Sequence, residues 1–420
     1  MTSGLSNFAA RLRELIANRQ SAIGNRQFSE LALELFALQF QNNPAYEKIC
    51  QARGMTPQLV EHWTQIPAVP TAAFKELELT CLPPEERTAV FYSSGTTKQK
   101  PSRHFHNAES LAVYETSLLA WFLPHLLPDK LELELQPSAA PVGVQALACD
   151  CGGKDSGLVM LAPPPEQAPH SSLVHMFETV RQTLGAPESA FVGKIAADGA
   201  WTLDFEAALA ALNLSLVTRH VSLLLGTAFS FVHLLDFLGE KNLRFDLPAG
   251  SRVMETGGYK NCSRTMPKAE LHALITDRLG VPPENIICEY GMSELSSQAY
   301  DTKLERRSPT RRDAVGVQAL ACSVGTLKHE LDRAASETGA PFGLRQFHFP
   351  PWARVQITSP ETGREVADGE TGLIRVFDLA NVFSVMAIQT EDLGVRRGGG
   401  FELTGRGQLT EPRGCSLLSV

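Results

Sequence analysis

The chain has 420 residues, which is enough for one large domain or two ordinary ones, and its 43% hydrophobic content is typical of a well-packed soluble protein. Its formal net charge of −8 argues against a basic nucleic-acid-binding surface, so nucleic acid is not an expected partner. The eight cysteines show no C-x-x-C pair and no metal-ligand spacing with histidine, which disfavours both a disulfide framework and a zinc site.

The first hundred residues are predicted to be mainly helical. Apolar residues recur at helical spacing in "FSELALELFALQFQ" (residues 28–41), and Asn42, Asn43 and Pro44 are expected to end that helix. The N-terminal segment has no apolar run followed by a small-residue cleavage site, so no signal peptide is expected. Together with cysteines that fit a reducing compartment, this favours a cytoplasmic location.

A loop rich in hydroxyl groups and cations follows in "FYSSGTTKQKPSRHFH" (residues 91–106). Its single glycine excludes a Walker A loop, which needs G-x-x-x-x-G-K-[ST]. The composition still fits a polyphosphate: hydroxyls can donate hydrogen bonds, a glycine permits close backbone approach, and cations neutralise charge. The residues concerned are Ser93, Ser94, Gly95, Thr96, Thr97, Lys98, Lys100 and Arg103. A solvated surface turn of the same composition is the alternative.

An exact internal repeat, "VGVQALAC", occurs at residues 142–149 and again at 315–322. Structural repeats diverge while keeping their period, whereas these identical copies stand in dissimilar surroundings. They are interpreted as duplicated insertions in surface loops, near 142–157 and 314–344.

The middle of the chain alternates strand-like and helical segments. Short β-rich runs such as "SRVMETGG" (251–258) and "NIICEYG" (285–291) flank the helical pattern of residues 265–280, which predicts an α/β architecture. The longest apolar stretch, Val221 to Leu238, carries too many polar residues for a membrane span. It is predicted as a buried helix, although residues 223–229 within it also resemble a strand.

A motif with one carboxylate follows the apolar run ending at residue 289. Tyr290, Gly291, Met292, Ser293 and Glu294 come directly after it. A carboxylate just past a strand end suits magnesium, which takes oxygen ligands and bridges protein to nucleotide phosphate, and Tyr290 could stack on a base. Glu294 is therefore a candidate magnesium ligand, although such a short string is weak by itself.

The C-terminal part is predicted to be a β-rich subdomain over residues 346–404. One strand-like run ends in Glu391 and Asp392, and an acid there can accept hydrogen bonds from both ribose hydroxyls. Arg406 follows closely enough to contact the same ribose or a phosphate oxygen. The alternatives are an acidic turn and an ordinary surface arginine.

Cys415 lies five residues before the end, beside Arg413. A cysteine with the ordinary pKa of about 8.5 is only a few per cent thiolate at neutral pH, and a neighbouring cation favours the reactive form. Cys415 is therefore a candidate nucleophile, and an incidental terminal cysteine is the alternative.

Taken together and in this order, these segments resemble the adenylate-forming superfamily of acyl-CoA synthetases, luciferases and peptide-synthetase adenylation domains. The segments "YSSGTT", "GGYK", "EYGMSELSSQAYD", "TEDLG" and "RGCSL" are most similar to the acyl-protein synthetase (long-chain-fatty-acid protein ligase) family of bacterial luminescence fatty-acid reductase systems. The similarity spans most of the chain outside the two suspected insertions.

The resemblance implies an ATP-dependent, AMP-forming ligase that requires Mg²⁺ and has a fatty acid as substrate. Residues 93–100 would wrap the ATP phosphates with Lys100 as a catalytic cation, and the acyl group would pass to a partner, in the family a reductase cysteine. By position, Gly257, Gly258 and Tyr259 would border the adenine. Tyr290 would stack on the adenine, in a motif that also contains Gly291, Ser293 and the magnesium ligand Glu294. Asp392 and Arg406 would contact the ribose.

The resemblance also implies a fold. The adenylate-forming large domain, with its helix-covered sheets, would occupy residues 1–345, followed by the β-rich subdomain and a mobile tail at 405–420, with the usual small C-terminal domain truncated. That domain carries the superfamily's catalytic lysine, and its loss disfavours an ordinary acyl-CoA ligase and favours Cys415 as acyl acceptor. Two other functions stay open: an acyl- or aryl-CoA ligase of the phenylacetate type, and a non-catalytic nucleotide- or acyl-binding subunit. His104, His106 and Lys260 are further candidates for phosphate or carboxylate contacts.

Overall fold

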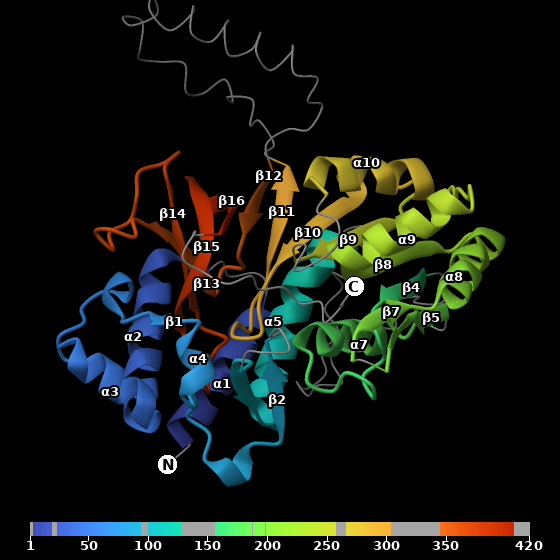
Figure 1. The fold of residues 1–420 in the computed structure, drawn as a ribbon. Helices are drawn as coiled ribbons and strands as arrows, with labels where there is room; N and C mark the ends of the chain where they lie inside the picture. The colour runs from blue at the N-terminus through green and yellow to red at the C-terminus, as the bar shows by residue number, and fades with distance from the viewer. Residues whose placement is uncertain are drawn as a thin grey trace, which may run out of the picture.

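The computed structural model describes residues 3–18, 23–93, 100–127, 156–186, 188–197, 199–257, 266–303 and 345–406. A twelve-stranded mixed sheet runs through the molecule, with helices packed against it (Figure 1). Eleven strands lie in the order β13-β14-β15-β16-β12-β11-β10-β9-β8-β4-β5, and β1 (Val69–Pro70) pairs with β15. The α/β class predicted from the sequence is confirmed.

One half of the sheet is parallel. It contains β4 (Ser156–Leu161), β5 (Glu188–Phe191), β8 (Val221–Thr227), β9 (Arg252–Thr256) and β10 (Ile286–Tyr290). Successive side chains of a strand point to opposite faces, so apolar residues throughout these strands bury both faces. Met160 belongs to the core on one face, whereas Val159 and Leu161 belong to the core on the other.

Helices cover both faces of this half (Figure 1). Residues of α5 (Ala108–Leu126) and α7 (Ser172–Leu184) share the core that contains Met160. Residues of α8 (Phe205–Thr218), α9 (Ala228–Glu240) and α10 (Lys268–Leu279) share the opposite core. In such sheets ligands bind beyond the carboxyl ends of the strands.

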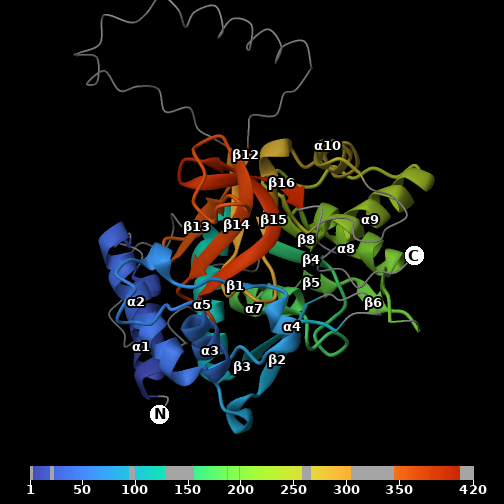
Figure 2. The same ribbon diagram turned by 60° about the vertical axis from the view of Figure 1, so that its left-hand side comes forward.

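The other half of the sheet is antiparallel. It contains β11 (Ala299–Lys303), β12 (Arg345–His348), β13 (Ala353–Thr358), β14 (Thr371–Asp378), β15 (Ala387–Arg397) and β16 (Gly400–Arg406). Figure 2 shows the strands β13 to β16 from the front, with the N-terminal helices beside them. These are α1 (Ser3–Ala17), α2 (Asn25–Asn42) and α3 (Pro44–Ala52), whose apolar faces share one core with β13, β14 and β15.

The helix predicted over residues 28–41 is confirmed as α2. The prediction that Val221 to Leu238 forms one buried helix is wrong, because the stretch divides into β8 and α9. Thr227 makes the division: its side-chain oxygen accepts a hydrogen bond from the backbone N–H of Ser230 at 3.1 Å and so caps α9. Gly226 before it lies so close to Leu161 and Ser230 that a Cβ would collide with both.

Smaller elements complete the described chain. They are the hairpin of β2 (Ala89–Tyr92) and β3 (Arg103–His106), the hairpin of β6 (Gly193–Ile195) and β7 (Trp201–Leu203), and the short helix α4 (Ala73–Glu76). Among the helices in the described ranges, none has the length and apolar character needed to cross a bilayer. The suspected insertions fall outside the described residues, except Ser156 and Gly157, which begin β4.

Candidate functional site

Two of the predicted nucleotide contacts meet across the sheet. The hydroxyl of Tyr290, the last residue of β10, donates a hydrogen bond to Oδ2 of Asp392 on β15 at 3.0 Å. Tyr290 is 6% exposed, and its ring packs edge-on against Phe349 and Phe401. A buried tyrosine whose hydroxyl is held in this way has a fixed ring plane.

Arg406 lies opposite Asp392 in the antiparallel ladder of β15 and β16. This register brings the backbones of the two predicted ribose contacts together. The side chain of Arg406 is outside the described part of the structure.

Glu294 follows Tyr290 in a buried turn. It is 1% exposed, and its Oε2 accepts a hydrogen bond from the hydroxyl of Ser293 at 3.1 Å. The carbonyl oxygen of Ser293 lies 2.7 Å from Nδ1 of His104 on β3. A carbonyl can only accept, so Nδ1 of His104 carries the proton.

His104 and His106 are both buried rather than at the surface. Burial lowers the pKa of His104, and the hydrogen bond to Ser293 and the nearby Glu294 oppose that shift only in part. Burial, together with His104 and His175, lowers the pKa of His106 further. Both imidazoles are therefore neutral near pH 7, and His104 ties the β2–β3 hairpin to the Glu294 turn.

The two ends of the predicted phosphate loop are joined. The backbone N–H of Ser102 donates to the hydroxyl oxygen of Ser93 at 2.9 Å, and the N–H of Ser93 donates to the carbonyl of Ser102 at 3.2 Å. Lys100 is half exposed and forms a surface ion pair with Glu76 at 3.4 Å. Such exposed pairs contribute about 1 kcal/mol or less, so a stronger anion can displace Glu76.

Gly257 lies directly after β9, beside the end of β10. Its φ of 75° is in the left-handed region, where glycine is favoured. A Cβ on Gly291 would meet Oε1 of Glu289, so a larger residue there would displace the Glu289 carboxyl.

Glu289 is a buried acid that sequence reasoning missed. Its carboxyl is hydrogen bonded to the hydroxyl of Thr256 on the neighbouring strand. Burial raises the pKa of Glu289 to about 7, while Thr256 lowers it and Glu255 raises it. An acid within the apolar run "IICEY" was the available signal, because an unpaired charge inside a parallel sheet is unfavourable.

Several predicted site residues lie outside the described residues, so their positions are not part of this geometry. They are Ser94, Gly95, Thr96, Thr97, Lys98, Gly258, Tyr259 and Cys415. Lys260, a further candidate contact, is in the same position.

The oxygen donors around Glu294 fit magnesium. A carboxylate and the Ser293 hydroxyl are hard ligands, and magnesium in nucleotide sites is commonly held by one or two carboxylates plus phosphate oxygens. Within the described ranges, no cluster of three or more His, Cys, Asp or Glu side chains has metal-binding geometry.

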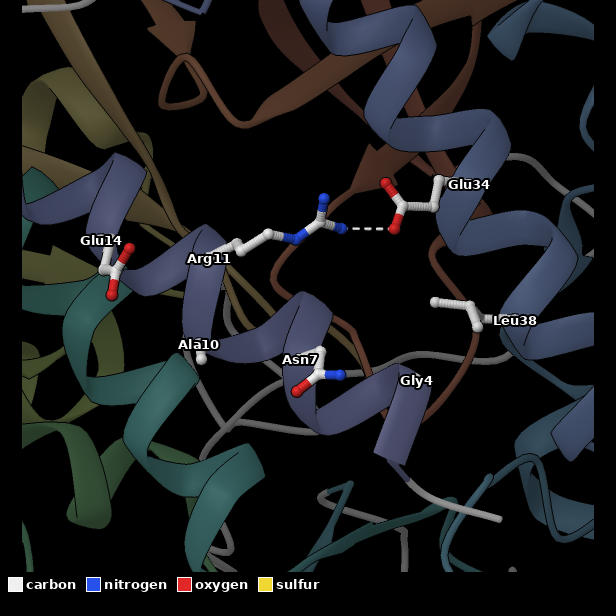
Figure 3. A pocket seen from close by; sticks show the side chains of 7 residues that line it. All are labelled: Gly4, Asn7, Ala10, Arg11, Glu14, Glu34 and Leu38. Atoms are coloured by element: carbon white, nitrogen blue, oxygen red, sulfur yellow. Dashed lines mark hydrogen bonds and ion pairs between the residues drawn. The ribbon is translucent and has the colours of Figure 1, made fainter.

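A surface pocket between α1 and α2 is separate from these residues (Figure 3). An ion pair between Arg11 and Glu34 spans it, and Gly4 and Leu38 approach each other at one end. None of the predicted site residues is among the seven that line it.

No protein-family model matches the chain. Two curated relatives do: a long-chain-fatty-acid–luciferin-component ligase of Aliivibrio fischeri is 21% identical over 369 residues, which are 87% of this chain and 78% of the relative. A ligase of the same name from Vibrio harveyi is 22% identical over 402 residues, which are 93% and 86% of the two chains.

Solved structures show the same fold. A 2-hydroxyisobutyryl-CoA ligase with a bound acyl-adenylate and CoA matches with TM-scores of 0.58 in its thioesterification state and 0.56 in an open conformation. Sequence identity is 11% in both cases, over 92% and 91% of this chain and 70% and 74% of the ligase. The chain is therefore similar in sequence to long-chain-fatty-acid–luciferin-component ligases and shares the fold of an acyl-CoA ligase that binds an acyl-adenylate, as the resemblance of its motifs led us to expect.

Proposed function

We propose that the protein uses ATP to activate a long-chain fatty acid as an acyl-adenylate and then carries the acyl group as a thioester on Cys415. The observation that supports this most is the hydrogen bond between Tyr290 and Asp392, since these are the residues that we propose stack on adenine and bind the ribose. The names of the two curated relatives, which are ligases of long-chain fatty acids, support the substrate class.

The first step forms the mixed anhydride. A carboxylate oxygen of the fatty acid attacks the α-phosphorus of ATP, the bond to the bridging oxygen breaks, and pyrophosphate leaves. Asp392 would bind the ribose hydroxyls, Tyr290 would stack on adenine, and residues 93–100 would hold the phosphates. A magnesium ion held through Glu294 would supply neutralisation of the phosphate charge. The protein's own contribution is alignment of the reactants.

The second step moves the acyl group. The thiolate of Cys415 attacks the acyl carbonyl carbon, the bond to AMP breaks, and the thiol proton goes to solvent. Cys415 lies nine positions after Arg406, and an extended chain of that length spans about 30 Å at roughly 3.3 Å per residue. We further propose that a partner protein, such as an acyl reductase, then accepts the acyl group.

Pyrophosphate exchange into ATP tests the first step. The wild-type protein should exchange labelled pyrophosphate only when magnesium and a long-chain fatty acid are present. Asp392→Ala should lose most of that exchange, whereas Cys415→Ser should retain it because the cysteine acts later. A protein that exchanges no label with any of a panel of carboxylic acids is a binding subunit and not a ligase.

Transfer to free coenzyme A is the second candidate, favoured by the matched fold of a CoA ligase. In that case Cys415→Ser would still make a soluble thioester when coenzyme A is supplied. Under our proposal, Cys415→Ser makes no soluble thioester.

A further inference from the structure

A buried polar network surrounds the turn that carries Glu294. Its centre is the connection between β14 and β15, and the carboxyl of Asp378 at the end of β14 is fully buried. Oδ2 of Asp378 accepts the backbone N–H groups of Ser296 at 3.0 Å and Ser297 at 2.8 Å, and Oδ1 accepts the Ser297 hydroxyl at 2.7 Å. Oδ1 also accepts the N–H of Ala380 at 3.0 Å.

Asn381 holds the same turn from a second direction. Its Nδ2 donates to the carbonyl oxygen of Glu294 at 2.8 Å and to that of Val385 at 3.1 Å. Its Oδ1 accepts the hydroxyl of Ser296 at 2.6 Å. Asp378 and Asn381 together therefore fix the backbone at residues 294, 296 and 297.

The connection is itself anchored to the N-terminal part of the chain. The buried amide of Gln39 on α2 donates to the carbonyl of Asn381 at 2.7 Å and accepts the N–H of Met386 at 3.1 Å. The connection that holds the turn is therefore itself hydrogen bonded to α2.

The chemistry of Asp378 favours an organising role. All four of its partners are uncharged donors, so burial prevails and raises the pKa of Asp378 to about 6, which leaves the group ionised at neutral pH. Among the described residues Asp378 has no cationic partner, and burial of an unpaired carboxylate costs free energy and does not stabilise the fold. Three of the four hydrogen bonds come from Ser296 and Ser297, which follow Glu294 closely in the chain.

We propose that Asp378 and Asn381 are positioning residues, which hold the Glu294 turn in the conformation that binds a divalent metal together with ATP. They touch neither metal nor substrate, and they act through the backbone of residues 294–297. This inference rests on the proposed function, because it assumes that Glu294 is the metal ligand. Residues that orient metal ligands from outside typically change metal affinity or activity 10–100-fold when mutated.

The test measures metal affinity apart from turnover. Mn²⁺ binding is followed by electron paramagnetic resonance in the presence of a non-hydrolysable ATP analogue, for the wild type, Asp378→Asn and Ser384→Ala. Asp378→Asn keeps the shape of the side chain but replaces one of its two acceptor oxygens by an NH2 donor, which would face other donors. It should weaken Mn²⁺ binding about tenfold or more and shift the magnesium dependence of pyrophosphate exchange by the same factor.

Ser384→Ala is the matched control, because the buried Ser384 hydroxyl donates to the carbonyl of Leu79 at 2.8 Å, and its loss removes none of the hydrogen bonds that Asp378 and Asn381 make to residues 294–297. It should bind Mn²⁺ as the wild type does. If Asp378→Asn does not fold, Ser296→Ala replaces it, since this change removes only the hydroxyl bond to Asn381 and should still weaken binding several-fold.

Equal Mn²⁺ affinity in the wild type and in a folded variant of the turn would overturn the inference, and so would an equal loss in Ser384→Ala. A wild-type protein that neither binds Mn²⁺ with the analogue nor exchanges pyrophosphate would instead contradict the proposed function, and the inference with it. Thermal unfolding of each variant shows which proteins are folded.

Discussion

Tyr290 and Asp392 are 102 residues apart in sequence, and their hydrogen bond joins two strands of the sheet. The individual motifs indicated each side chain, but their contact depends on the order of the strands. Glu289 was missed because it lies within an apolar run, and Asp378 and Asn381 because they are scattered through the largely apolar segment 376–386. Such residues become informative only when their buried partners are known.

Tyr290→Phe should raise the KM for ATP in pyrophosphate exchange about tenfold. The change removes one hydrogen bond to a carboxyl, for which about 1.4 kcal/mol, or a factor of ten, is a reasonable value. Tyr46→Phe is the matched control, since Tyr46 is buried and its hydroxyl donates to the carbonyl of Pro67 at 2.8 Å. The control should lose comparable stability with an unchanged KM for ATP, and an unchanged KM in both variants would contradict the role of Tyr290.

Glu289→Gln should flatten the pH dependence of stability. Burial raises the pKa of Glu289 from 4.5 to about 7. Between these two pH values the carboxyl is protonated in the folded state and ionised in the unfolded state. The free energy of unfolding therefore falls as pH rises through this window, by at most about 3 kcal/mol from this group. Urea unfolding at pH 5, 6, 7 and 8 should show the variant gaining on the wild type as pH rises. A constant difference between the two proteins would refute the assignment.

At the scale of elements, the sequence predicted the strands β9 and β10, the helices α2 and α10, and β structure over residues 346–404. It failed at residues 221–238, because a continuous apolar run has no period that separates a buried strand from a buried helix. The signal was present in Thr227, a cap residue within the run. Caps of this kind are a local contribution to helix stability that can be measured.

Asn107 caps α5, the helix that follows the β2–β3 hairpin. Its side-chain oxygen accepts the N–H of Ser110 at 2.9 Å, and the Ser110 hydroxyl accepts the N–H of Asn107 at 2.9 Å. Asn107→Ala should lower the free energy of unfolding by about 1 kcal/mol, whereas Asn107→Asp should be nearly neutral because aspartate caps helices equally well. Urea denaturation compares the three proteins. An equal loss in both variants would mean that the cap is not the stabilising contact.

At the scale of the whole molecule, the sheet order could not be predicted from the sequence. β16, the last strand described, lies between β12 and β15, and this arrangement brings Arg406 opposite Asp392. Long-range pairings of this kind follow from the packing of the complete sheet and leave no local pattern. The resemblance to the adenylate-forming enzymes supplied what local patterns could not, and the matched fold agrees with it.

We propose that adenylation at the site of Tyr290, Glu294 and Asp392 is followed by acyl transfer to Cys415 of the same chain. We therefore expect Cys415→Ser still to form acyl-AMP but not to form the stable acyl-protein. Cys288→Ser is a suitable control for the variant, because Cys288 is a buried cysteine whose thiol pKa burial raises, which makes it a poor nucleophile.

Intact-protein mass spectrometry after incubation with ATP, magnesium and a long-chain fatty acid tests the central claim most directly. The account predicts that the wild type and Cys288→Ser gain the mass of one acyl group, that hydroxylamine removes it, and that Cys415→Ser gains none. An unchanged mass in the wild type, or an acyl group that remains on Cys415→Ser, would contradict it.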